Sequence, residues 1–189
     1  MIKMGLYSEP INEVVKGYAG LYRESFIVDF AKNNDRLERL INSFFEISVN
    51  GQDLEYNEDN KKMITELYQN LKGANWGGDL ICFTDEKCIE IPGFAMVGYD
   101  ICADSMHYSP IGDGFLVQYH ANPDFYTDMS FETYSMYRDN INERWLFNSY
   151  EIATMFSEYC NYINKKNLHC IESQDHWRPT AIAVDVLIK

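Results

Sequence analysis

Apolar residues change their spacing along this chain, and the order of these changes limits the folds open to it. In the first part they recur every three or four residues, which is the helical period, and in the middle they form short runs typical of strands. One more helical segment follows near the carboxyl end. Early helices, central strands and a late helix predict an α+β fold, with a mainly antiparallel sheet packed against about three helices.

Three segments carry a helical stripe of apolar residues. Residues 34–46 form the first, with Asn33 or Asn34 as the expected cap. Residues 63–71 form the second, and residues 149–165 form the third. Asn148 and Glu151 have the spacing of a capping box, so we expect the third helix to begin there.

Short apolar runs predict the strands. They cover residues 79–84, 87–91, 94–102, 115–119, 168–171 and 181–188. The polar pair at 85–86 between the first two runs predicts a β-hairpin. The run at 94–102 is typical of a central strand, with Asp100 as the exception in it, whereas residues 50–60 predict a loop.

The chain of 189 residues shows no linker-like or low-complexity stretch and no evident repeat, so we predict a single domain over residues 1–189. No apolar run is long enough for a signal peptide or a membrane span. The odd number of scattered cysteines is typical of a reducing compartment. These features predict a cytoplasmic protein without a membrane partner.

The formal net charge of −13 limits the classes of molecule that this chain is expected to bind. Such a charge repels phosphate backbones, which argues against nucleic acid as a ligand. It attracts a basic protein and raises the rate of encounter with it, although acidity also serves plain solubility. We therefore expect a basic protein as partner.

Residues 99–114 bring together the side chains of a candidate catalytic site. His107 is the candidate base, Asp104 the group that orients it, and Ser109 a candidate nucleophile. No nucleophile-elbow sequence frames the serine, and such residues also fix turns by hydrogen bonding. An enzyme is therefore the less favoured interpretation.

Cofactor and metal motifs are not found in the sequence. Cysteines and histidines lack the spacing of common metal sites, and Cys88 and Cys102 are expected in the core. The glycines between 73 and 78 match neither the P-loop nor the dinucleotide fingerprint. We predict no metal and no cofactor.

Aromatic and acidic residues alternate between residues 118 and 145, a composition that suits a partner surface. The predicted partner-binding residues are Tyr119, Asp124, Tyr126, Asp128, Glu132, Tyr134, Tyr137 and Asp139. The open alternative is a segment that covers the core and turns a solvated acidic face outward.

Three functional hypotheses follow. The first is a small acidic binding protein, such as an immunity protein or antitoxin, that neutralises a basic toxin domain, for example a nuclease. The second is a small hydrolase or transferase that uses residues 99–114. The third is an oligomerisation module, a homo-oligomer in which exposed aromatic side chains pack against another copy of the chain.

Overall fold

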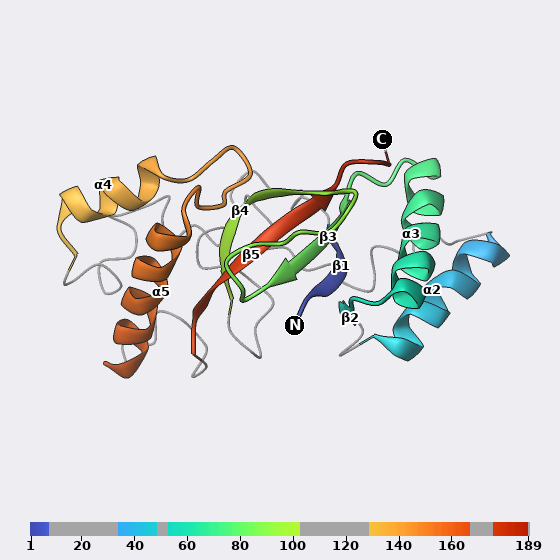
Figure 1. Cartoon of the computed structure of the whole chain (residues 1–189), viewed down its shortest axis with the longest axis horizontal. Coiled ribbons are helices and arrows are strands. Elements are labelled where there is room, and N and C mark those ends of the chain that lie inside the picture. Colours follow the sequence, from blue (N-terminus) through green and yellow to red (C-terminus); the bar gives the residue numbers. More distant parts are fainter. Residues whose placement is uncertain (8–33, 49–52, 103–128, 167–175, 189) are drawn as a thin grey trace. The chain divides into compact units, whose positions relative to one another are not determined.

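The computed structural model describes residues 1–7, 34–48, 53–102, 129–166 and 176–188. Their helices and strands (Figure 1) are, in chain order, β1 (Lys3–Tyr7), α2 (Asp35–Ile47), β2 (Asp53–Glu55), α3 (Glu58–Gly73), β3 (Asp79–Thr84), β4 (Phe94–Cys102), α4 (Phe131–Asp139), α5 (Tyr150–Lys165) and β5 (Arg178–Asp185). The strand order in the sheet is β2-β1-β3-β5-β4. The predicted α+β class with a mainly antiparallel sheet is confirmed.

The described residues fall into two compact units. The first holds residues 1–7, 34–96 and 182–188, apart from the gap at 49–52, and the second holds residues 97–102, 129–166 and 176–181. The prediction that the whole chain forms a single domain stays a prediction.

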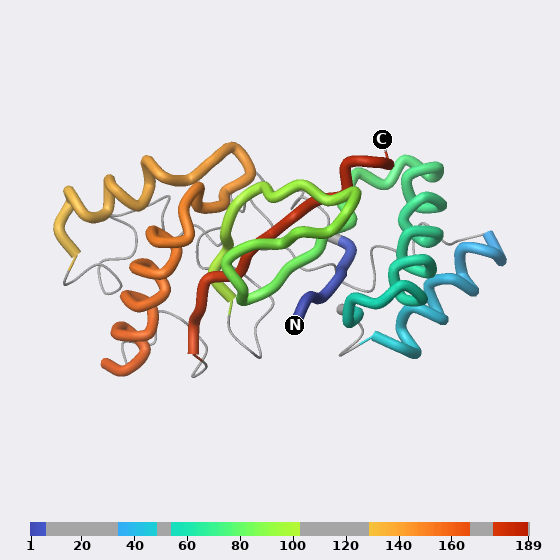
Figure 2. Tube along the Cα trace, viewed as in Figure 1, coloured from blue at the N-terminus to red at the C-terminus, as the bar shows by residue number. Residues whose placement is uncertain are grey.

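The first unit is built around β1, a strand that the sequence patterns did not reveal. It pairs antiparallel with both β2 and β3, so that Met4 lies opposite Leu54 on one side and Cys82 on the other. All three side chains are buried. In Figure 2 the blue amino-terminal strand and the green β3 lie side by side although they are far apart in the sequence. Residues 53–55, expected in a loop, supply the edge strand β2.

Helices α2 and α3 belong to the first unit and contact each other. Helix α3 also contacts β1 and β3. Of the two caps expected for α2, the structure has Asn34, whose side chain accepts a hydrogen bond from the Leu37 backbone N–H at 3.1 Å. The predicted stripe is also confirmed, because Leu37, Ile41 and Phe44 are buried. Helix α3 begins earlier than its apolar stripe, since Asn57 caps it by accepting from the Asn60 N–H at 2.8 Å. A cap can extend a helix beyond the residues that its stripe marks.

The predicted hairpin is wrong in its second half, because residues 87–91 form no strand. In the sheet β3 has β1 on one side and β5 on the other, so no edge of β3 is left for that segment. Ile89 and Ile91 are nevertheless buried, and Cys88 between β3 and Ile89 is exposed. The expectation that Cys88 lies in the core is therefore also wrong.

The bounds predicted for β4 are confirmed, but its predicted central position is not. β4 lies at one end of the strand order, next to β5 alone. β5 itself runs from Arg178 to Asp185, three residues earlier than the predicted strand at 181–188. The strands predicted at 115–119 and 168–171 lie outside the described residues.

The second unit has its own core. Its buried members come from β4, α4, α5, the segments next to them and the residue before β5: Ile101, Met129, Tyr134, Tyr137, Phe147, Ala153, Phe156, Cys160, Ile163 and Trp177. Phe156 is central, with ring centroids 5.0 Å from Tyr137 and 5.5 Å from Phe147. These contacts join α4, α5 and the segment before α5 into one packed body.

Helix α5 confirms the predicted third helix with one correction at its start. Ser149 is the cap instead of Asn148: its hydroxyl accepts from the Ile152 N–H at 3.4 Å and donates to Glu151 at 2.9 Å. Most of the predicted stripe faces the core, but Met155 keeps 45% of its surface exposed.

The end of β4 is tied to the segment before α5. Tyr99 and Phe147 exchange two backbone hydrogen bonds of 2.9 and 2.8 Å. Asn142 supports this bridge, because its Nδ2 donates to the Val97 carbonyl at 2.7 Å and its Oδ1 accepts from the Leu146 N–H at 3.2 Å. The edge of β4 is covered here by a backbone contact.

Candidate interaction surface

Helix α4 holds four of the eight predicted partner-binding residues, namely Glu132, Tyr134, Tyr137 and Asp139. The other four, Tyr119, Asp124, Tyr126 and Asp128, lie outside the described residues. Ser130 caps the helix by accepting from the Thr133 N–H at 3.1 Å. The apolar pattern of the sequence did not predict this helix, although a capping serine followed by two tyrosines three residues apart could have revealed it.

The two tyrosines of α4 lie in the core of the second unit. Tyr134 is 5% exposed and Tyr137 is 4% exposed. Burial raises the pKa of Tyr137 to about 12, with smaller contributions from Cys160 and Glu158. A partner that docks on the folded surface would meet neither ring, so we remove both residues from the candidate surface.

What remains on α4 is an exposed aromatic ring at its first residue and two exposed carboxylates further along the helix. Phe131 is 62% exposed, and its ring centroid lies 6.1 Å from that of Tyr134. Glu132 and Asp139 are both exposed. Phe131, which was not among the predicted partner residues, is thus the exposed aromatic side chain of α4, in contrast to the two tyrosines.

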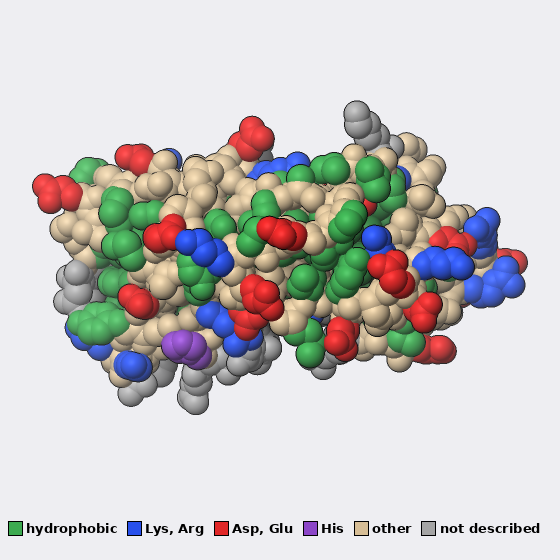
Figure 3. All heavy atoms as spheres, in the orientation of Figure 1, with side chains coloured by type: hydrophobic (Ala, Val, Ile, Leu, Met, Phe, Trp, Pro, Cys, Tyr) green, Lys and Arg blue, Asp and Glu red, His purple; other side chains and the backbone are tan. Residues whose placement is uncertain are grey.

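Carboxylates are exposed well beyond α4. Among the described acidic residues only Asp100 is buried, where its carboxylate accepts from the Ile101 N–H at 2.7 Å. Acidic side chains are spread over the face shown in Figure 3. The carboxylates of the described residues are therefore mostly presented to solvent.

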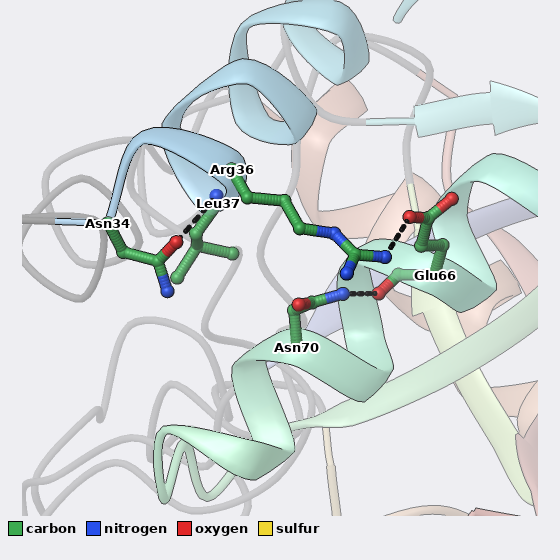
Figure 4. Close-up of polar contacts among 5 residues, drawn as sticks. All are labelled: Asn34, Arg36, Leu37, Glu66 and Asn70. Atoms are coloured by element: carbon green, nitrogen blue, oxygen red, sulfur yellow. Dashed lines mark hydrogen bonds and ion pairs between the residues drawn. The ribbon is translucent and has the colours of Figure 1, made fainter.

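A shallow pocket of about 430 Å³ opens between the start of α2 and the end of α3, lined by Asn34, Arg36, Gln69, Asn70, Gly73 and Ala74. Figure 4 shows the polar contacts in and beside it. Arg36 donates to the Glu66 carboxylate at 2.7 Å, and Asn70 donates to the Glu66 carbonyl at 2.7 Å. Small-molecule sites usually have apolar walls, which these lining residues do not provide. The pocket is weak as a ligand site.

The alternative catalytic residues, Asp104, His107 and Ser109, lie outside the described residues, so the hydrolase or transferase hypothesis stays a prediction. Within the described ranges, no three His, Cys, Asp or Glu side chains gather closely enough to hold a metal ion. Among the helices of the same ranges, none has both the length and the apolar composition needed to cross a membrane.

No family model, no curated protein and no solved structure matches this chain.

Proposed function

We propose that this chain is an acidic binding protein that masks a basic protein partner. The observation that carries the proposal is the exposure of its acid excess: the net charge is −13, and nearly all described carboxylates reach the surface. Such a field speeds the encounter with a basic partner and selects against acidic ones.

The contact surface that we propose is the outer side of α4, which carries the exposed Phe131 and the exposed carboxylates of Glu132 and Asp139. An aromatic side chain supplies contact area at low entropic cost, and it becomes a strong anchor when a partner covers it. Glu132 and Asp139 can pair with lysine or arginine across such a contact. The described part of α4 also carries Arg138, which is exposed, so the surface is acidic by excess rather than uniformly.

An immunity protein or antitoxin is the specific role that this chemistry suits. Basic enzymes such as nucleases need positive charge to bind their substrates, and an acidic protein can cover that surface. None of the four described cysteines forms a disulfide, which supports a reducing compartment such as the cytoplasm.

Affinity capture with matched baits tests the proposal. The wild-type chain, a surface variant (Phe131→Ala, Glu132→Gln, Asp139→Asn) and a control variant (Ile47→Ala, Glu38→Gln, Glu46→Gln) are each exposed to lysate of the native host. Both variants lose two negative charges and one exposed apolar side chain, but only the surface variant changes α4.

We expect wild type and control to retain one basic protein that the surface variant loses. The purified pair should then form a stoichiometric complex in which any enzymatic activity of the partner is inhibited. Equal retention of the partner by all three baits would argue against the proposed surface. A complex in which an enzymatic partner stays fully active would argue against the proposed inhibition.

A further inference from the structure

Helix α5 carries a second apolar seam beside the stripe that faces the core. The α5 seam consists of the apolar or aromatic residues Ile152, Met155, Tyr159 and Tyr162 and of the C-cap residue Lys166 after them, all at alternating steps of three and four residues. That spacing is the heptad pattern by which one helix packs along another. Within the single chain this seam is only partly covered.

Two of its members are open to solvent. Met155 is 45% exposed and Tyr162 is 43% exposed, whereas Ile152 and Tyr159 are partly buried against the core. The rings of Tyr159 and Tyr162 lie 6.3 Å apart, and Lys166 Nζ lies 4.4 Å from the centroid of Tyr162. The carboxyl-terminal half of the seam is thus a row of side chains in contact with one another. In Figure 3, hydrophobic side chains and carboxylates both reach the surface around α5.

A charged row flanks the seam on its open side. Glu151, Glu158 and Lys165 follow at steps of seven residues, and all three are exposed. The other flank holds Phe156 and Ile163, which are fully buried. The open flank is therefore acidic toward the start of the helix and basic at its end.

This charge order is self-complementary in an antiparallel pair. When two such helices run in opposite directions, the flanking charged rows meet each other, and Glu151 of one copy lies opposite Lys165 of the other. Ile152 then lies opposite Tyr162 and Met155 opposite Tyr159. A parallel pair would instead bring the charged row against the buried flank of Phe156 and Ile163. The helix dipoles also favour the antiparallel arrangement.

From this complementarity we infer that the α5 seam docks an antiparallel α5 of a second copy of this chain. The pair is weak, because one 16-residue helix per copy makes a contact at the small end of specific interfaces. Glu158 lies near its own counterpart at the two-fold axis, which weakens the pair further. We expect a dissociation constant in the micromolar range or above.

Exchanging the charges at residues 151 and 165 tests this dimer. The test uses the purified chain alone and is therefore independent of any basic partner. Sedimentation equilibrium up to about 0.5 mM protein should show a monomer–dimer equilibrium for the wild type. Glu151→Lys and Lys165→Glu should each weaken dimerisation about tenfold, because each places like charges opposite each other. An equimolar mixture of the two variants should restore the wild-type dimer, since the mixed pair regains both opposite-charge contacts.

Glu46→Lys, which reverses the charge of an exposed residue on α2, is the control. It should dimerise slightly more than the wild type, because a smaller net negative charge weakens the repulsion between two copies. Met155→Asp should abolish the dimer while the circular dichroism spectrum is retained. A wild type that stays monomeric at about 0.5 mM would overturn the inference. So would a dimer indifferent to Met155→Asp, or a variant mixture that remains monomeric.

Discussion

The side chain of Asn161 holds both backbone polar groups of Trp177. Its Nδ2 donates to the Trp177 carbonyl at 2.8 Å, and its Oδ1 accepts from the Trp177 N–H at 2.7 Å. Both residues are buried, so this amide replaces water for two backbone groups next to the start of β5. One side chain of α5 thereby fixes where the chain enters the last strand.

Asn161→Leu should destabilise the protein by about 2–4 kcal/mol, because it leaves two buried backbone groups without their partner. The free energy of unfolding from urea titration measures this loss. Glu158→Gln, an exposed change one turn earlier on the same helix, should alter it by less than about 0.5 kcal/mol. Equal stability of the Leu variant and the wild type would show that Asn161 does not hold Trp177.

Gly98→Ala should destabilise the protein by at least about 2 kcal/mol. Gly98 has φ +145°, and an added Cβ would lie 2.8 Å from the Leu146 Cβ and from the Phe147 carbonyl oxygen. The backbone bridge between Tyr99 and Phe147 would have to open. Gly73→Ala is the matched control, because a Cβ there meets nothing within 4 Å, and its melting temperature should equal or exceed that of the wild type. An unchanged melting temperature for Gly98→Ala would contradict the close approach.

Two substitutions at the start of α5 distinguish the observed cap, Ser149, from Asn148, the cap expected from the sequence. Ser149→Ala should cost about 1 kcal/mol, because the hydroxyl accepts from the Ile152 N–H, whereas Asn148→Ala should cost little. Thermal denaturation of both variants measures the difference. The reverse order of stabilities would restore Asn148 as the cap.

Tyr137 should contribute to alkaline unfolding. Its pKa rises to about 12 in the folded protein through burial, whereas the unfolded chain titrates near the ordinary value of about 10. The unfolded state therefore releases its proton first, and this contribution to stability is constant below about pH 10 and is lost as the pH rises toward 12. Urea titrations at several pH values should show a smaller alkaline loss for Tyr137→Phe. Parallel curves for both proteins would contradict the raised pKa.

The thiols should separate into reactive and protected groups. Burial raises the pKa of Cys82 to about 12 and raises the pKa of Cys160, so neither forms thiolate near neutral pH, whereas Cys88 is exposed. Brief treatment with iodoacetamide followed by peptide mass spectrometry should find Cys88 modified in the folded protein. Cys82 and Cys160 should react only after denaturation, and their rapid modification in the folded state would contradict the burial.

The sequence predicted those elements whose signal is local. The stripes of α2 and α5 and the cap at Asn34 depend on neighbours within a few turns, and the structure contains all three. The strand predicted at residues 87–91 is wrong, although their apolar alternation is typical of a strand. Which segments pair with β3 is decided by distant parts of the chain, here β1 and β5.

The candidate surface was harder to predict, because composition alone does not tell an exposed aromatic residue from a buried one. Phe131 and Tyr134 lie three residues apart on α4, yet the first is exposed and the second is buried. The difference arises from the packing of α4 against Phe156 and its neighbours, which is a tertiary contact. The partner surface itself stays a prediction, and burial removes two of its predicted residues, Tyr134 and Tyr137.

The most direct test of an acidic binding protein is the association rate with its purified basic partner as a function of ionic strength. For the wild type we predict a rate that falls at least about tenfold between roughly 50 and 500 mM salt, as expected for attraction between opposite charges. The rate for the Phe131→Ala, Glu132→Gln, Asp139→Asn variant should be lower and less dependent on salt than that of the α2 control. An association rate that does not change with salt would contradict the central claim.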